Sequence, residues 1–154
     1  MFRNEYTMNR NFFKEYVFNI LCKDIIIVGI ILTVVSMIIY FMLNVTYAMF
    51  SFLFIVFFML FCPFIMINNL EENSKRLNNG RIEKTSVDFN DNIIMNEGKV
   101  HLEFEYSQIK KIKQTKNFYV LMLSSKSAIL VFKDGFTSGN KEEFLRFIEK
   151  NSRK

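Results

Sequence analysis

Few side chains in this sequence have the types and spacing that catalysis or metal binding requires. His101 is the only histidine, and the two cysteines, Cys22 and Cys62, do not have the spacing of a metal motif. A catalytic histidine needs a nucleophile or a second acid or base beside it, and no such constellation surrounds His101. We therefore interpret His101 as a solvated strand residue and both cysteines as free packing residues. The sequence predicts no enzyme activity, no cofactor and no metal site.

The most distinctive polar cluster is basic, and it consists of Lys110, Lys111, Lys113 and Lys116. Each lysine near an anionic membrane surface adds about 1 kcal/mol of attraction. Lysines on an edge strand also prevent that strand from pairing with another chain. The cluster is thus a candidate contact for anionic lipid or a protein partner, with edge protection as the alternative. Nucleic acid fits less well, because acidic residues lie nearby and the net charge of the chain is only +5.

A long uncharged run decides the class of protein. The 46 residues Ile25–Leu70 contain no Asp, Glu, Lys or Arg, although these types make up 23% of the chain. A helix crosses the hydrocarbon core with about 20 apolar residues, so this run fits two passes and is too long for one. Asn44-Val45-Thr46-Tyr47 predicts the turn between helices at Ile25–Leu43 and Ala48–Ile67. Asn44 also begins a glycosylation acceptor pattern, which we interpret as part of the turn.

The basic residues predict the orientation of this hairpin. Lysine and arginine concentrate on the cytoplasmic side of membrane proteins. They occur on both flanks of the uncharged run and are absent from its turn, so we expect a cell-membrane protein with two passes and both termini in the cytoplasm. Ile25–Leu43 is longer than the apolar core of a signal peptide, so we expect both helices to be retained. The flanking residues are Arg3, Arg10, Lys14 and Lys23 before the run, and Lys75, Arg76, Arg81 and Lys84 after it.

Inside the first span, Gly29, Thr33 and Ser36 form a stripe of small residues at helical spacing. Small residues let helices approach closely in lipid, so we expect this stripe to pack against the second span or a second copy. Pro63 predicts a kink or the end of the regular second helix. Neither span carries a charged side chain, and transporters usually need one. The hairpin is therefore interpreted as an anchor.

After the hairpin the hydrophobic period changes from that of a helix to that of strands. Lys99–Tyr106 alternates strictly and predicts a half-buried strand with Val100, Leu102 and Phe104 facing inward. A final helix is predicted after Asn140, which can cap it. These elements describe a small antiparallel meander closed by a C-terminal helix. The other predicted strands are Thr85–Phe89, Ile93–Asn96, Lys111–Thr115, Phe118–Leu123 and Ala128–Phe132.

Three blocks in this part resemble the C-terminal domain of the bacterial YcxB-like family, in which a Tyr-x-x-Ile turn, a hairpin, a Lys and a Glu-Glu-Phe helix recur. The resemblance implies a membrane-tethered domain similar to a pleckstrin-homology fold, without an assigned activity. The sequence departs from the pattern at Phe132, where relatives commonly have a proline, and this departure affects any role carried over for Lys133. The blocks are Tyr106–Ile112, Phe118–Leu123 and Ala128–Lys133, followed by Glu142-Glu143-Phe144.

The sequence as a whole predicts an α+β membrane protein with four parts. Its expected function is that of a non-enzymatic, membrane-anchored interaction or regulatory module, which contacts membrane lipid, a membrane protein partner or a second copy. The alternative is an accessory or immunity component of a transport system, in which the hairpin is the working part. The four parts are an N-terminal amphipathic cytoplasmic segment at 1–24, the transmembrane two-helix hairpin at 25–67, a polar linker at 68–84 and the YcxB-like cytoplasmic β domain with its C-terminal helix at 85–154.

Overall fold

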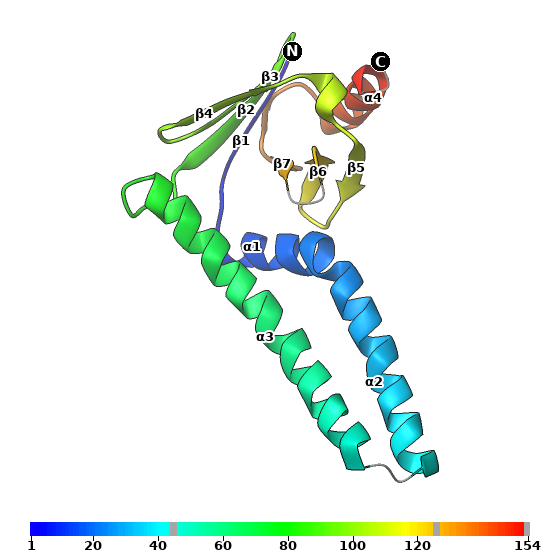
Figure 1. The fold of residues 1–154 in the computed structure, drawn as a ribbon. Helices are drawn as coiled ribbons and strands as arrows, with labels where there is room; N and C mark the ends of the chain where they lie inside the picture. The colour runs from blue at the N-terminus through cyan, green and yellow to red at the C-terminus, as the bar shows by residue number, and fades with distance from the viewer. Residues whose placement is uncertain (44–45, 125–126, 153–154) are drawn as a thin grey trace. The chain divides into compact units, whose positions relative to one another are not determined.

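The computed structural model describes residues 1–43, 46–124 and 127–152, which form two compact units (Figure 1). One unit combines Met1–Phe12 with the segment from Glu71 onward and contains the sheets, and the other is the helical segment Phe13–Leu70. The helices of the chain are α1 (Arg10–Tyr16), the π-helical turn η1 (Val17–Leu21), α2 (Lys23–Leu43), α3 (Thr46–Leu77), the 3₁₀ turn η2 (Tyr106–Gln108) and α4 (Lys141–Asn151).

Two of these helices, α2 and α3, are long and apolar enough to cross a membrane. Only 6% and 11% of their most hydrophobic windows are buried, unlike the core helices of a soluble protein. The chain passes from one to the other between Leu43 and Thr46, where the sequence predicts the break. Asn44 and Val45, on which the prediction of the turn itself falls, lie outside the described residues.

The helix α3 is longer than the sequence predicted. Pro63 lies inside it, and the helix does not end there. Residues 68–77, expected to belong to a polar linker, are its last turns. The helix ends where Asn79 and Gly80 adopt the left-handed backbone conformation, with φ of 55° and 84°. This stop follows from the tolerance of Asn and Gly for that conformation, as expected.

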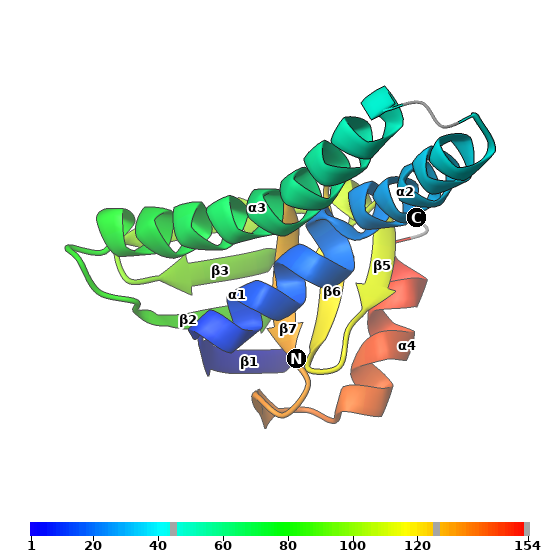
Figure 2. The ribbon, with the colours of Figure 1, turned by 90° about the horizontal axis from the view of Figure 1, so that it is seen from below.

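The β unit contains two antiparallel sheets where the sequence predicted one meander (Figure 2). The larger sheet has the strand order β4-β3-β2-β1-β8, and the smaller one has the order β5-β6-β7. The strands are β1 (Phe2–Thr7), β2 (Lys84–Phe89), β3 (Ile93–Glu97), β4 (Val100–Phe104), β5 (Lys111–Gln114), β6 (Phe118–Met122), β7 (Ala128–Phe132) and β8 (Phe136–Ser138).

The strand β1 joins the two ends of the chain in one sheet. It pairs with β2 along six residues, from Phe2 opposite Phe89 to Thr7 opposite Lys84, and it pairs with β8 on its other side. The sequence interpretation placed residues 1–24 in a separate segment and missed this strand. β1 precedes α2 in the sequence and its partner β2 follows α3. The larger sheet therefore combines residues from both sides of the two apolar helices.

A buried asparagine links the two sheets. Asn4 is fully buried in β1, and its side-chain amide donates to the carbonyl of Phe132 in β7 at 2.7 Å. The Asn4 side-chain oxygen accepts from the Phe132 N–H at 2.9 Å. The Phe132 N–H, at the edge of the smaller sheet, is thereby satisfied, and the Phe132 carbonyl accepts from Asn4 in addition to the Gly135 N–H. Asn4 therefore satisfies the polar groups at the place where the sheets meet.

Aromatic side chains fill the core between the sheets and α4. Phe144 of α4 is fully buried, with its ring 4.7 Å from that of Phe89 and 6.1 Å from that of Tyr119, which belong to different sheets. The Asn140 side chain caps α4 by accepting from the Glu142 N–H at 3.1 Å, as predicted. The helix thus closes the core from one side.

The inward face predicted for β4 is only partly covered. Val100 and Phe104 are half-buried, but Leu102 is 42% exposed. β4 is the outermost strand of the larger sheet, so its centre extends beyond the region that α4 and the smaller sheet cover. Alternation correctly predicted the strand, but burial depends on the strand order, which alternation does not encode.

We expect Asn4→Leu to destabilise the β unit by about 1 to 3 kcal/mol, because it leaves the N–H of Phe132 without the Asn4 acceptor, while the Phe132 carbonyl still accepts from the Gly135 N–H. Pulse proteolysis in urea of the purified full-length protein measures the change. Thr7→Leu, at an exposed position of the same strand, serves as the control and should have little effect. Equal stability of the two variants would show that Asn4 does not join the sheets.

Candidate functional site

The four candidate lysines do not form one patch. Lys111 and Lys113 belong to β5, an edge strand of the smaller sheet, and lie opposite Met122 and Val120 of β6. Alternation places both on the same face of the sheet. Lys110 precedes the strand, and Lys116 follows it in the turn to β6. The structure therefore places Lys111 and Lys113 on one face of the sheet, with Lys110 and Lys116 outside the strand.

The face that carries Lys111 and Lys113 is also the face that the N-terminal segment contacts. Phe118 lies on this face because it shares the alternation of Val120, and the ring of Phe12 packs against it at 4.9 Å. Phe12 is the last residue of the β unit before the helical segment begins. The N-terminal segment thus covers part of the face that carries the two lysines.

A cavity of about 290 Å³ lies between β5 and the end of α4, but it suits an anion poorly. The C-terminal end of a helix carries partial negative charge, and Glu149 adds a carboxylate to the wall. Lys110 and Lys111 balance these charges. The lining residues are Ile109, Lys110, Lys111, Ile112, Glu149 and Ser152.

Lys133 has a structural role in this unit. Its ammonium donates to the carbonyl of Thr115 at 2.6 Å and lies 5.3 Å from the centre of the Tyr119 ring. Its N–H donates to the carbonyl of Asn117 at 2.8 Å. Lys133 therefore holds the turn between β5 and β6. The N–H of Phe132 bonds Asn4, which a proline at that position would prevent.

The Tyr-x-x-Ile turn is also structural. The Tyr106 hydroxyl donates to the carbonyl of Asn90 at 2.8 Å, and its ring packs against Phe147 of α4 at 5.5 Å. Burial and the nearby Asp91 carboxylate raise the pKa of Tyr106 to about 12, so the phenol remains a donor at neutral pH. Ile109 is buried at the start of β5. The turn thus fixes β5, the strand that carries Lys111 and Lys113 and is called the basic strand below, to the larger sheet and to α4.

A polar junction that the sequence did not reveal holds the end of α3 to the β unit. Asn78 is 4% exposed, and its side-chain amide donates to the Glu97 carboxylate at 3.2 Å. Ser74 donates to the same carboxylate at 2.7 Å. The only sequence signal at Asn78 was that of a helix stop. This junction anchors the last turns of α3 against the turn between β3 and β4.

Within the helical unit, the stripe of small residues faces α3. A Cβ atom at Gly29 would lie 2.5 Å from the sulfur of Met59, so a larger residue requires the Met59 side chain to move. The Thr33 hydroxyl donates to the Gly29 carbonyl at 2.8 Å. Ser36 lines a smaller groove of about 170 Å³ between α2 and the start of α3. The stripe is thus used inside the hairpin.

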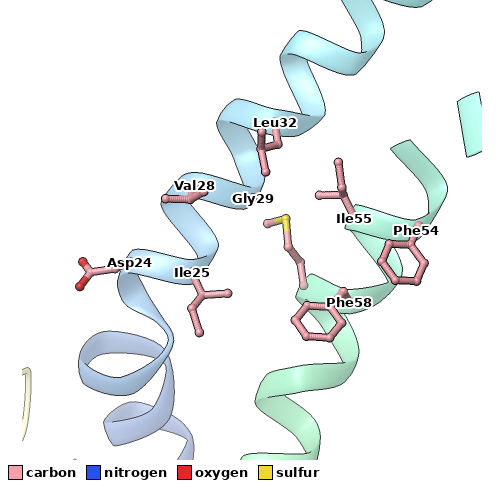
Figure 3. A pocket seen from close by; sticks show the side chains of 9 residues that line it. Asp24, Ile25, Val28, Gly29, Leu32, Phe54, Ile55 and Phe58 are labelled. Carbon is pink, nitrogen blue, oxygen red and sulfur yellow. The ribbon is translucent and has the colours of Figure 1, made fainter. Parts of the chain in front are cut away.

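An apolar groove of about 410 Å³ lies between α2 and α3 (Figure 3). Side chains such as Val28, Leu32 and Phe58 line it, and Asp24, at its end, points away from α3 in Figure 3. The groove contains no polar group that would orient a ligand. Among the residues that the structure describes, no group of three or more His, Cys, Asp or Glu could hold a metal ion.

Comparison with known proteins supports the resemblance seen in the sequence. Residues 89–148 match the family model described as YcxB-like protein, which confirms the family inferred from the sequence for this part of the chain. The match begins at the last residue of β2 and ends within α4. It includes the basic strand and leaves out β1. No curated protein and no solved structure matches the chain.

We expect Gly29→Leu to separate α2 from α3, because the added side chain meets Met59. The native thiols measure this: the Cys22 thiol donates to the Met66 sulfur at 3.4 Å, and Cys62 lies one turn before Met66 on α3, so a short bifunctional thiol reagent should link the two cysteines in the native protein. The substitution should greatly reduce linking, and adding Met59→Ala should restore it. Ile30→Leu, on the exposed side, is the control. Unchanged linking in Gly29→Leu would contradict the packing described.

Proposed function

We propose that this chain, which carries a YcxB-like domain at residues 89–148, is a membrane-anchored interaction module. In this proposal α2 and α3 cross the cell membrane, and both termini lie in the cytoplasm. The β unit is held beside the inner leaflet, where the face of the smaller sheet that carries Lys111 and Lys113 contacts anionic lipid. The module acts by binding and carries out no chemical reaction.

The pairing of β1 with β2 carries the membrane part of this proposal. These strands lie on either side of the two apolar helices in the sequence and are adjacent in one sheet. Strands that pair must be in the same compartment. An even number of crossings between them is therefore required, and two helices of sufficient length are present. The basic residues on both flanks support the cytoplasm as that compartment.

The arrangement of the β unit also supports a likeness to a pleckstrin-homology fold. Two antiparallel sheets enclose an aromatic core, and a C-terminal helix, α4, closes it. The present unit adds β1 from the far side of the hairpin sequence. Because fold alone does not determine function, the proposal depends on the surface charges and the tether.

Lipid binding is supported by where the lysines lie. Lys111 and Lys113 lie on the face of the smaller sheet against which Phe12 packs. In this proposal the short stretch of sequence between Phe12 and α2, which begins at Lys23, keeps the β unit near the bilayer, so even weak attraction is effective. Each lysine near an anionic leaflet contributes about 1 kcal/mol. The competing explanation is edge protection of β5, which requires no particular lipid.

A second candidate function makes the hairpin the working part of a transport or immunity component. The apolar groove between α2 and α3 favours this candidate, because a lipid chain or a partner helix would fit it. Both spans, however, lack charged residues between Ile25 and Leu70. Ion and proton pathways usually need such residues, so the anchor is the better explanation.

Reporter proteins fused at residue 1 and at residue 154 test the topology. We expect both to report the cytoplasm, because β1 and β2 must meet after two crossings. Signals from opposite sides of the membrane would rule out the hairpin. Signals from the outside at both ends would keep the hairpin and contradict its orientation.

Lysine acylation measured by mass spectrometry tests the lipid contact. The full chain is reconstituted into vesicles of phosphatidylcholine, with or without phosphatidylglycerol. We expect Lys111 and Lys113 to react about fivefold more slowly in the anionic vesicles, the change that corresponds to about 1 kcal/mol per lysine. High salt should remove the difference.

Lys99 and Lys150 are the internal controls for this experiment, because both are exposed and lie outside β5. Their rates should be the same in both kinds of vesicle. Equal rates for Lys111 and Lys113 in both vesicles would remove the lipid contact and leave edge protection as the role of these lysines.

A further inference from the structure

The outer edge of β4 is open. Within the described residues β4 pairs with β3 alone, and it is the outermost strand of the larger sheet (Figure 1). Its three central residues, His101, Leu102 and Glu103, are exposed. An edge strand presents unpaired N–H and C=O groups that can bind another strand. The register with β3 runs from Val100 to Phe104 without a shift, so the edge is regular.

The other strands at sheet ends differ from β4 in ways that discourage pairing. β5 carries lysines, which protect an edge. β8 has three residues and a shifted register with β1. β7 is occupied by Asn4, which bonds the main chain of Phe132. The five residues of β4 contain no lysine and no proline. This strand is therefore the edge best suited to receive a partner.

The sequence around β4 is complementary to itself. If two copies run antiparallel with Leu102 opposite Leu102, His101 of each copy lies opposite Glu103 of the other, so an imidazole N–H can donate to a carboxylate. On the other face Val100 lies opposite Phe104, so apolar side chains meet apolar ones along the five residues of the strand. Hydrogen-bonding pairs and apolar pairs at directly opposed positions stabilise antiparallel strands.

The polar pairs also select this register. Moving the partner by two residues removes both pairs of His101 with Glu103 and, in one direction, places Glu103 opposite Glu103, which is unfavourable. Moving it by one residue places apolar side chains on the polar face. Local hydrogen bonds hold the polar side chains in position: Asn92 donates to one oxygen of Glu103 at 2.7 Å, and the Nδ1 of His101 lies 2.5 Å from the Asn96 side-chain oxygen. The other Glu103 oxygen and the Nε2 of His101 can then meet the partner.

We propose that β4 pairs with β4 of a second copy of this chain, so that the two larger sheets form one continuous sheet across a two-fold axis. The contact is isologous, as is usual for homodimers. The pairing of β4 does not involve β5, which lies in the smaller sheet, or its lysines. The proposed dimer is therefore independent of the lipid contact.

Disulfide cross-linking of the full chain in vesicles tests the pairing and its register. Both native cysteines are first replaced by serine. Residues directly opposed in antiparallel strands have Cβ atoms about 5 Å apart, so Leu102→Cys should form a reducible dimer. Thr137→Cys, exposed on β8 of the same sheet, is the control for random collision and should not.

The register has its own test. Val100→Cys and Phe104→Cys should each form little dimer alone, and coexpression of the two should produce the mixed dimer. Leu102→Lys places two charges opposite each other and should abolish association, measured by single-molecule photobleaching, while proteolytic stability stays that of the unsubstituted chain because the side chain is exposed. Cross-linking no greater at residue 102 than at residue 137, or a dimer that survives Leu102→Lys, would overturn the proposal.

Discussion

Main-chain pairing between β1 and β2 is the interaction on which the rest of the structure depends. It joins a strand that precedes α2 to one that follows α3, with six residues in register. β1 also brings Asn4 to the edge of β7, so the same strand connects the two sheets. Without β1 the larger sheet loses its contact with β8 and the smaller sheet loses its polar link. The folded unit is therefore larger than residues 89–148, which match the family.

Much of the fold could be predicted because its signals are local. Strands β2 to β7, α4 with its Asn140 cap and the two apolar helices each show a pattern within a few neighbouring residues. β1 could not be predicted in the same way, because its partner lies far away in the sequence and its central inward residue, Asn4, is polar. The exposure of Leu102 was also beyond prediction, since it follows from the position of β4 at the end of the sheet. Strand order is a property of the whole chain.

In the candidate site, lysines that are close together in the sequence do not all lie on one face of the sheet. Of the four neighbouring lysines, Lys111 and Lys113 share a face, and Lys110 and Lys116 lie outside the strand. Residues that the family pattern emphasises have structural roles: Tyr106 and Lys133 hold the ends of β5 in place. What these residues fix is the orientation of the basic strand. The proposed lipid contact therefore depends on surface charges held by a rigid frame.

The strand order has a consequence for synthesis of the chain on the ribosome. β1 is made first, yet its partners emerge only after both apolar helices, and the bonds of Asn4 need β7, which comes later still. The nascent strand must therefore wait until both helices have been made. In the proposed topology, failure of one helix to insert would leave β1 and β2 in different compartments, with the core open to proteases. Closure of the sheet would then act as a checkpoint that only correctly inserted molecules pass.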